Sequence, residues 1–283
     1  SQFDCAFDSD NNELDGVSEY WVKGKDNTSF DFTGGITGEV DAIITDVWVD
    51  PIEGTDNGNL IGNQNNPFLT IDYAMGMIYP TEDNPITIHL TAGEFSPSNN
   101  NEVFFIYMLS NVNLIGQGED VTILDAEQSA YGMLIFESSN NILRNFTITQ
   151  GYHLDDNFGG DGGGILIYNS SDILIEFVII YENYSVSNGG GLYIDYCDNI
   201  VISHSKIQNN QGGLGGGISI ADDESIRLNE ILISNNTANS GGGMSLHRVD
   251  HGAILKNVTV VDNIAHDNGG GIKLYNSDPL LHN

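Results

Sequence analysis

Short apolar pairs, in which one residue separates two aliphatic side chains, recur along the second half of the chain. Examples are Ile173/Ile175, Ile200/Ile202 and Ile226/Leu228. This alternation has the period of two that side chains follow on a β-strand, where every second one faces the same side. A helix would instead need apolar spacings of three and four residues. We therefore expect an all-β fold built from short strands.

The apolar pairs stand at fixed distances from five glycine triplets. One pair follows each triplet directly, and a second begins nine or ten residues after its last glycine. Successive last glycines are 27, 26, 26 and 28 residues apart, and a fixed period predicts a stack of similar units. We expect a parallel β-helix with three short strands per coil, and glycine-rich coils over 132–283. The triplets are Gly162–Gly164, Gly189–Gly191, Gly215–Gly217, Gly241–Gly243 and Gly269–Gly271.

An asparagine follows the third apolar pair of each repeat at a constant spacing. Asparagine tolerates the left-handed conformation of a corner, and stacked amides can form hydrogen bonds from coil to coil. We therefore predict an internal asparagine ladder. Its members are Asn183, Asn210, Asn236 and Asn263.

The N-terminal part of the chain has a different organisation. Residues 1–45 form an acidic extension with poor periodicity, and 46–283 form the β-helix domain. Val47–Val49 is predicted to be a strand. A short helix at about 70–79, with Thr70 as its N-cap, is expected to cap the stack. The last coil stops unfinished, so we expect the parent protein to continue or another chain to cover this end.

The charge of the chain excludes some classes of partner. Lys and Arg total 8 against 40 acids, a formal net charge of −32. Nucleic acid is therefore excluded as a partner, and binding to polyanionic glycans or anionic membranes is disfavoured. No apolar stretch is long enough for direct membrane insertion. The acidity has two interpretations, solubility in a salty medium or cation binding. Cys5 and Cys197 form a disulfide or remain two thiols.

Acidic residues seven positions after the last glycines predict a calcium site. Coils lie about 4.8 Å apart, so the carboxylates would stack and repel unless Ca²⁺ lay between them. The alternative is an exposed turn, in which Asp is a common residue. A looser calcium-loop pattern lies at 8–16. The stacked residues are Asp198, Glu224, Asp250 and Asp278.

Two further regions carry candidate ligand-binding residues. An insert at 151–161 combines acidic and aromatic side chains, which suit a sugar or a metal, although it could be a loop without a function. Outward positions of the first strand form columns that could stack on a glycan, or could simply be good strand formers. The insert contributes Tyr152, His153, Asp155 and Asp156 as ligand-binding residues and Asp161 as a metal ligand. The columns contribute Tyr168, Tyr193, Asp195, His247 and Tyr275.

The stretch from Val47-Trp48-Val49-Asp50 to Pro67-Phe68-Leu69-Thr70-Ile71 resembles the entry module of the right-handed parallel β-helix superfamily of pectate lyase-like proteins. The Gly-Gly-Ile and Ile-x-x-Asn repeats are similar to those of polymorphic outer-membrane adhesins and autotransporter-like surface proteins. The resemblance covers about 47–283 and implies a right-handed helix, whereas the family spans lyases, hydrolases, epimerases and adhesins. If the chain were a calcium-dependent lyase, the implied bases would be Arg227, Arg248 and Lys256.

These observations favour a secreted or bacterial cell-surface module over an enzyme. We expect a structural, adhesive or glycan-binding role, with Ca²⁺ as a stabilising ion. The expected partner is an extracellular glycan or surface ligand, or neighbouring copies of the chain. One alternative is a calcium-dependent polysaccharide lyase or related carbohydrate-active enzyme. Another is a structural subunit of an extracellular filament or stalk.

Overall fold

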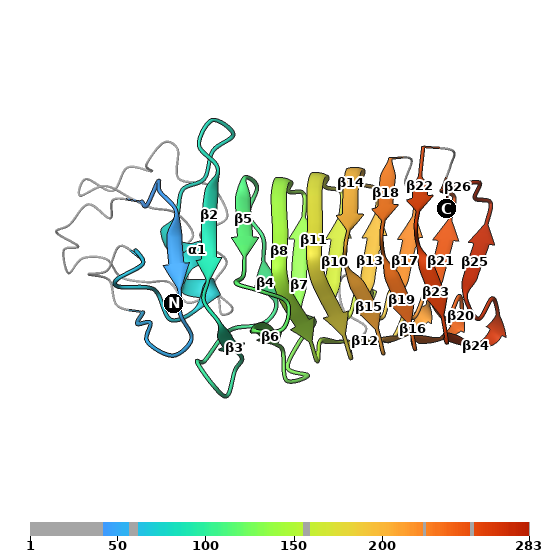
Figure 1. Cartoon of the computed structure of the whole chain (residues 1–283), viewed down its shortest axis with the longest axis horizontal. Helices are drawn as coiled ribbons and strands as arrows, with labels where there is room; N and C mark the ends of the chain where they lie inside the picture. Colours follow the sequence, from blue (N-terminus) through green and yellow to red (C-terminus); the bar gives the residue numbers. More distant parts are fainter. Residues whose placement is uncertain (1–41, 57–61, 155–158, 223–224, 250–251, 283) are drawn as a thin grey trace, which may run out of the picture.

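A computed structural model describes residues 42–56, 62–154, 159–222, 225–249 and 252–282. Their strands form three parallel sheets of 14, 7 and 5 strands, wound into a solenoid of about seven turns. Figure 1 shows the coils stacked along the long axis, with a short helix at the N-terminal end. The sequence-based prediction of an all-β parallel solenoid is confirmed.

The middle coils contribute to all three sheets in turn, whereas the first coils contribute mainly to the 14-stranded sheet. The 14-stranded sheet contains β1 (Val47–Val49), β2 (Ile86–Leu90), β3 (Gly93–Phe95), β5 (Val112–Ile115), β6 (Thr122–Asp125), β8 (Ser139–Thr149), β11 (Ser171–Tyr181), β14 (Asp198–Ser203), β15 (Lys206–Gln208), β18 (Ile226–Asn229), β19 (Leu232–Ser234), β22 (Ile254–Lys256), β23 (Thr259–Val261) and β26 (Leu280–His282). The seven-stranded sheet contains β4 (Ile106–Tyr107), β7 (Met133–Phe136), β10 (Ile165–Tyr168), β13 (Leu192–Asp195), β17 (Ile218–Ala221), β21 (Met244–His247) and β25 (Ile272–Tyr275). The five-stranded sheet contains β9 (Tyr152–His153), β12 (Tyr184–Ser185), β16 (Gln211–Leu214), β20 (Thr237–Ser240) and β24 (Ile264–Asn268).

The helix α1 (Ile71–Met77) lies where the sequence places a capping helix. The Thr70 hydroxyl accepts a hydrogen bond from the Tyr73 amide at 3.1 Å, as expected of an N-cap. A second cap was not foreseen. The buried carboxylate of Glu102 accepts hydrogen bonds from the amides of Ile71 (2.8 Å) and Asp72 (3.1 Å). Two side chains thus satisfy the free amides of the first turn.

Neighbouring coils align residue for residue, so the core is a set of aliphatic columns. In the seven-stranded sheet, Ile165 pairs with Leu192, and Leu192 pairs with Ile218; all three side chains are fully buried. In two coils the strands differ from the predicted three short strands per coil. β8 and β11 are continuous 11-residue strands in which a left-handed residue, Asn145 or Phe177, lies between the second and third segments.

The asparagine ladder is present. The Asn183 side-chain amide donates to Asn210 Oδ1 at 3.0 Å, that of Asn210 to Asn236 Oδ1 at 3.1 Å, and that of Asn236 to Asn263 Oδ1 at 3.0 Å. Each Oδ1 also accepts a backbone amide from the preceding member. Since Asn183, Asn210 and Asn236 are buried, the ladder satisfies polar groups that would otherwise be costly inside the core.

The first glycine of each triplet makes a turn that other residues would strain. Gly215 has a φ of +62°, and a Cβ placed on it would lie 2.1 Å from the carbonyl oxygen of Ile218. Gly189 shows the same arrangement, with a φ of +63° and the Tyr193 amide 2.8 Å from the ideal Cβ. The turn therefore lies directly against the outer face of the strand that follows it.

Both ends of the described stack differ from its middle. Ile43 forms a bridge with Ile78 beside α1, whereas 1–41, most of the predicted acidic extension, lie outside the described residues. In the terminal coil, Ile272 and Leu274 are 37% and 50% exposed, because they belong to the last described layer. Within the described part of the chain, no helix has the length and apolar character needed to cross a membrane.

Candidate functional site

The clearest assembly of predicted ligand-binding residues lies where the strands of the seven-stranded sheet end. The last residues of these strands are aligned by β-pairing, and we call them the edge row. Their side chains face away from the core columns, because they alternate with the buried inward residues of the same strands. The edge row consists of Phe136, Tyr168, Asp195, Ala221, His247 and Tyr275.

Aromatic side chains occupy the two ends of the edge row. The rings of Phe136 and Tyr168 stack at 5.9 Å, and those of His247 and Tyr275 stack at 5.0 Å. Tyr196, at the next corner, meets Tyr168 edge to face at 5.7 Å and is 55% exposed. Tyr275 is 54% exposed. Two exposed aromatic surfaces therefore flank the middle of the row, where Asp195 and the small Ala221 stand.

Asp195 is a buried carboxyl group in the middle of the row. Its Oδ2 accepts a hydrogen bond from the Tyr193 hydroxyl at 3.0 Å, whereas its Oδ1 finds no hydrogen-bond partner among the described residues. Burial raises the pKa of Asp195 to about 6, and the nearby charge of Asp222 acts in the same direction. The hydrogen bond from Tyr193 opposes this shift but does not outweigh burial.

A second carboxyl group beside the row has a pKa that is shifted in the opposite direction. Asp222 follows Ala221 at the corner, and its carboxylate receives two hydrogen bonds from the Arg248 guanidinium one coil further on. These hydrogen bonds hold the pKa of Asp222 below its ordinary value, although partial burial opposes them. At mildly acidic pH the site therefore combines a neutral Asp195 with an ionised Asp222.

The other predicted column is covered. This column consists of Leu166, Tyr193, Ser219, Ser245 and Lys273. The first four are buried, whereas Lys273 in the terminal coil is partly exposed. The first glycine of the preceding triplet lies against the backbone or Cβ of each column residue, and the burial of the first four closes most of the column to a ligand. Tyr193 contributes instead by its hydrogen bond to Asp195. The alternation of the sequence correctly predicted that these side chains face outward. It did not predict the backbone turn beside them.

The insert at 151–161 uses two of its polar groups to hold itself in place. His153 Nδ1 forms a hydrogen bond with the carbonyl oxygen of Asp161, and its ring stacks on Tyr131 at 4.1 Å. The Asp161 carboxylate accepts the backbone amide of Asn188 at 2.8 Å and its side-chain amide at 2.9 Å. Tyr152 is partly exposed and stacks on Tyr184 at 4.8 Å. Asp155 and Asp156 lie outside the described residues.

The predicted calcium column is described only in part. Asp198 and Asp278 are exposed, and Asp198 accepts a hydrogen bond from Ser225. Glu224 and Asp250, the members between them, lie outside the described residues, as does the calcium-loop pattern at 8–16. Among the residues that the structure describes, no group of three or more His, Cys, Asp or Glu side chains could hold a metal ion. Calcium binding therefore stays a prediction.

The three basic residues implied for a lyase have different surroundings. Arg227 donates to Asn199 Oδ1 at 3.2 Å, and Lys256 is an exposed residue at the end of β22. Arg248 alone joins the edge-row site. Its contact with Asp222 raises the pKa of the guanidinium, which keeps Arg248 protonated and therefore unable to accept a proton from a substrate. Cys197 is buried at the corner beside the site, and Cys5 lies outside the described residues.

The sequence did not single out Tyr196 and Asp222. Both occupy the left-handed corner that follows the edge row, with φ of 53° and 50°. Arg248 has the same position one coil beyond Asp222, with a φ of 55°. A signal was present, because these residues directly follow the outward positions Asp195, Ala221 and His247 in the repeat register.

The chain belongs to the right-handed β-helix family, whose model, described as "Right handed beta helix region", matches residues 98–283. A comparison with curated proteins finds no match. Among solved structures, pectin methylesterase PemA from Erwinia chrysanthemi is similar at 11% identity and a TM-score of 0.49, over 75% of this chain and 64% of that chain. The chain thus spans less than two thirds of the length of that esterase.

Two further solved structures show a similar fold. Pectate lyase Pel9A has 10% identity and a TM-score of 0.43, over 83% of this chain and 78% of that one. Tailspike protein 2 of Escherichia coli bacteriophage CAB120 has 13% identity and a TM-score of 0.42, over 70% of this chain and 25% of that one. The role of this chain must therefore be argued from its own side chains.

Proposed function

We propose that this chain is a carbohydrate-binding β-helix module of the extracellular space or cell surface, and that the edge row binds the glycan. The observation that carries the proposal is the pair of exposed aromatic surfaces, Tyr168 with Tyr196 and His247 with Tyr275, on either side of Asp195. Aromatic rings offer flat apolar faces with polar edges, which suit the two faces of a sugar ring.

Charge favours a neutral glycan as the ligand. The chain carries a net charge of −32, so a polyanionic sugar would be repelled as it approached. A neutral sugar offers hydroxyl groups that both donate and accept hydrogen bonds. Asp195, with its pKa of about 6, can exchange such bonds in either protonation state.

Binding can be tested with a panel of neutral oligosaccharides and isothermal titration calorimetry. Tyr275→Ala removes one exposed ring of the row and should weaken binding about tenfold, since an aromatic contact contributes on the order of 1 kcal/mol beyond the area it buries. The matched control is Tyr181→Ala, which removes a partly exposed tyrosine from β11 in the 14-stranded sheet, away from the row. Equal affinities for both variants and the parent protein would refute the role of the edge row.

A carbohydrate-active enzyme is the second candidate, supported by the two carboxyl groups. Their pKa values are shifted in opposite directions, which is the pattern expected of an acid and a base that act together. Asp195 would donate a proton to a leaving oxygen, and Asp222 would activate water or attack the substrate itself. Asp222→Asn should then abolish the release of reducing ends or of esterified groups while leaving oligosaccharide affinity largely intact. Binding without turnover in the parent protein would exclude this candidate.

A further inference from the structure

The carboxyl group of Asp195 is covered, although it stands in the middle of the edge row. Asp195 is 8% exposed, and its Oδ1 is buried with no hydrogen-bond partner among the described residues. Its Oδ2 accepts the hydroxyl of Tyr193 at 3.0 Å, and the Tyr193 side chain is itself buried. A sugar hydroxyl that lies on the row therefore cannot reach Oδ1 unless the surrounding atoms move.

The groups around Asp195 make its ionisation costly. Burial raises the pKa of Asp195 to about 6, and the negative charges of Asp222 and Asp161 act in the same direction. Arg248 brings a positive charge near the site, but its guanidinium donates two hydrogen bonds to Asp222. The titratable groups around the carboxyl group are Tyr193 and Tyr196 from its own coil, Tyr168 from β10, Asp161 from the insert, Asp222 after β17, and His247 and Arg248 at the end of β21 and its corner.

Asp195 changes its charge in the mildly acidic range, whereas the carboxyl group beside it does not. At pH 5 most Asp195 side chains are neutral, and at pH 8 nearly all of them are ionised. The hydrogen bonds from Arg248 hold the pKa of Asp222 below its ordinary value, so Asp222 stays charged over this whole range. The charge in the middle of the row therefore depends on pH through Asp195.

A ligand that covers the row would shift this balance in one direction. It would displace the water that reaches the row and so remove the screening that water gives to a charge at Asp195. It would not compensate with a hydrogen bond to Oδ1, which is buried, whereas Oδ2 already accepts the Tyr193 hydroxyl. The neutral carboxyl group loses less than the carboxylate, so the ligand prefers the protonated site. By linkage, the bound ligand also makes Asp195 hold its proton more tightly.

We infer that Asp195 makes the edge row a pH-dependent glycan site, which takes up a proton as it binds its ligand and binds more weakly as the surroundings become alkaline. The inference rests on the proposed function of the edge row and adds the group that regulates it. Each unit by which binding raises the pKa of Asp195 corresponds to about a tenfold preference of the ligand for the protonated site. The effect requires no direct contact between Asp195 and the sugar.

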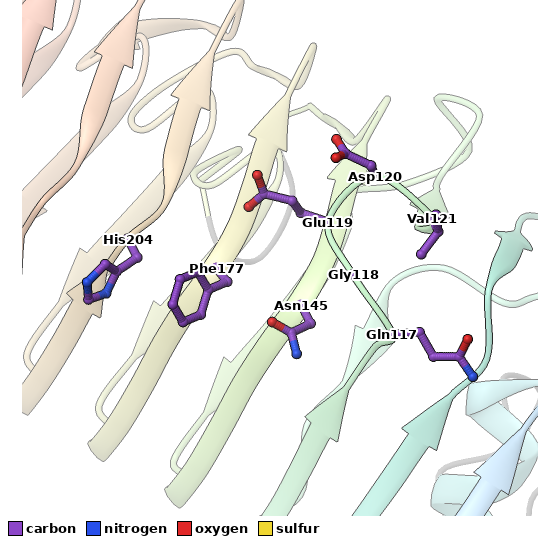
Figure 2. Close-up of a pocket in the computed structure, with 8 residues that line it drawn as sticks. All are labelled: Gln117, Gly118, Glu119, Asp120, Val121, Asn145, Phe177 and His204. Atoms are coloured by element: carbon purple, nitrogen blue, oxygen red, sulfur yellow. The ribbon is translucent and has the colours of Figure 1, made fainter.

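A second titratable ring lies in a groove of about 450 Å³ at a corner within the 14-stranded sheet, and it provides a control. Figure 2 shows this groove, with His204 at one end of a row of residues from successive coils. The His204 Nε2 lies 3.2 Å from Glu230, and its Nδ1 lies 3.6 Å from Glu176. A saccharide held in this groove would meet His204 and not Asp195, so its pH dependence would survive replacement of Asp195.

The test titrates the full chain with neutral hexasaccharides of cellulose, mannan and xylan by isothermal titration calorimetry between pH 5 and pH 8. The hexasaccharide that binds most tightly at pH 5 is used for every variant. We expect the dissociation constant of the parent protein to rise about fivefold or more from pH 5 to pH 8. The binding heat at pH 6.5 should also change with the ionisation enthalpy of the buffer, because a proton is taken up. Asp195→Asn should bind equally well at all pH values and take up no proton.

Tyr193→Phe is a second variant that tests the same group without replacing it. The Tyr193 hydroxyl lowers the pKa of Asp195, so its removal should move the fall in affinity to higher pH. The side chain is buried, so the variant leaves the ligand contacts in place. Two controls replace other titratable rings. His247→Gln in the row and His204→Gln in the groove should both keep the ratio of affinities between pH 5 and pH 8.

The outcomes separate this inference from the proposed function. If no hexasaccharide binds at any pH, the proposed function fails and the inference fails with it. A hexasaccharide that binds equally well at pH 5 and pH 8, or better at pH 8, leaves the proposed function standing and overturns the inference. The inference is also overturned if Asp195→Asn keeps the pH dependence of the parent protein. Loss of that dependence in His204→Gln would place the ligand in the groove and overturn both.

Discussion

At the scale of single residues, several surface rings stand at corners that the backbone does not favour. Most left-handed corners of the described chain carry Asn, Asp or Glu, whereas Phe177, Tyr196 and His204 place rings there with φ of 53°, 53° and 48°. Each of these rings contacts a neighbouring ring, Tyr196 edge to face and the other two by stacking, and each remains partly exposed. Rings in strained, solvent-facing positions are expected where a surface is shaped for contact rather than for stability.

Asp195 illustrates the same conflict between site and stability. Because its pKa is raised in the folded state, the proton binds more tightly to the folded chain than to the unfolded one. The stability linked to that proton is present below about pH 4 and is lost as pH rises toward 6. Asp195→Asn removes the buried charge and should raise the free energy of unfolding at pH 8, by on the order of 1–2 kcal/mol after solvent screening.

Calorimetric melting at pH 8 and pH 4 tests this effect. The gain should appear at pH 8 and shrink at pH 4, where Asp195 is already largely neutral in the folded state. A variant less stable than the parent at pH 8 would mean that the carboxylate is stabilised by its surroundings. Asp222→Asn is a useful contrast, since loss of its contact with Arg248 should not stabilise the protein.

At the scale of elements, the asparagine ladder joins the coils through buried amides. Asn236 forms four such bonds, because Oδ1 accepts from the amide and side chain of Asn210 and Nδ2 donates to Ile207 and Asn263. Asn236→Ala leaves several buried groups without partners and should lower the free energy of unfolding by about 2–4 kcal/mol. The control is the neighbouring exposed Asn235→Gly, expected within about 0.5 kcal/mol of the parent. Denaturation by urea measures both, and equal midpoints would contradict the ladder's role.

The capping helix is held by a carboxyl group that titrates near neutrality. Burial raises the pKa of Glu102 to about 7, despite the backbone amides that it accepts. Its linked stability is therefore complete below about pH 4.5 and is lost as pH rises through 7. The shift corresponds to roughly 3 kcal/mol. Glu102→Gln should flatten the fall in melting temperature between pH 5 and pH 8, and a slope equal to that of the parent would show that Glu102 does not titrate there.

The elements were predictable because the period of the sequence is the period of the structure. The glycine spacing gave the register of the core columns, and the aliphatic-x-x-Asn pattern gave the ladder. Thr70 gave the N-cap of α1. What remained hidden depends on contacts between segments far apart in sequence. Glu102 caps a helix about thirty residues earlier, and Gly189 covers Tyr193 because the turn folds back over the strand. The local sequence pattern predicts neither of these contacts.

The candidate sites were predictable in part for the same reason. The alternation predicted that Tyr168, Asp195, His247 and Tyr275 lie in one column, and the structure aligns them in the edge row. Tyr196 and Asp222 were missed, because their place beside the row depends on left-handed φ angles at the corners, which the spacing of apolar residues does not reveal.

At the scale of the whole molecule, the chain has 40 acids against 8 bases, and most of the acids belong to the part of the sequence that forms the closely spaced coils. Aligned carboxylates on neighbouring coils are separated by only about 4.8 Å of backbone spacing. Several basic groups are already engaged, as Arg144 is with Glu176, Lys206 with Glu119 and Arg248 with Asp222. Most of the negative charge is thus left to repel itself and to oppose compact folding.

Salt should therefore stabilise the chain. The screening length falls from about 30 Å at 0.01 M salt to about 10 Å at 0.1 M, which weakens repulsion between exposed carboxylates. We expect the melting temperature to rise by about 3 °C or more between 10 and 150 mM NaCl, equivalent to roughly 1 kcal/mol for a chain of this size. A melting temperature independent of NaCl would show that the carboxylates are too far apart to repel strongly.

Calcium at matched ionic strength separates screening from specific binding. If Ca²⁺ lies in the column that contains Asp198 and Asp278, CaCl₂ should raise the melting temperature beyond the value in MgCl₂, and the rise should saturate, because Ca²⁺ accepts irregular oxygen sites that Mg²⁺ does not. Asp198→Asn should then remove the difference between the two cations. The same rise with both cations would mean that the acidic surface responds to ionic strength alone, and the predicted calcium column would be wrong.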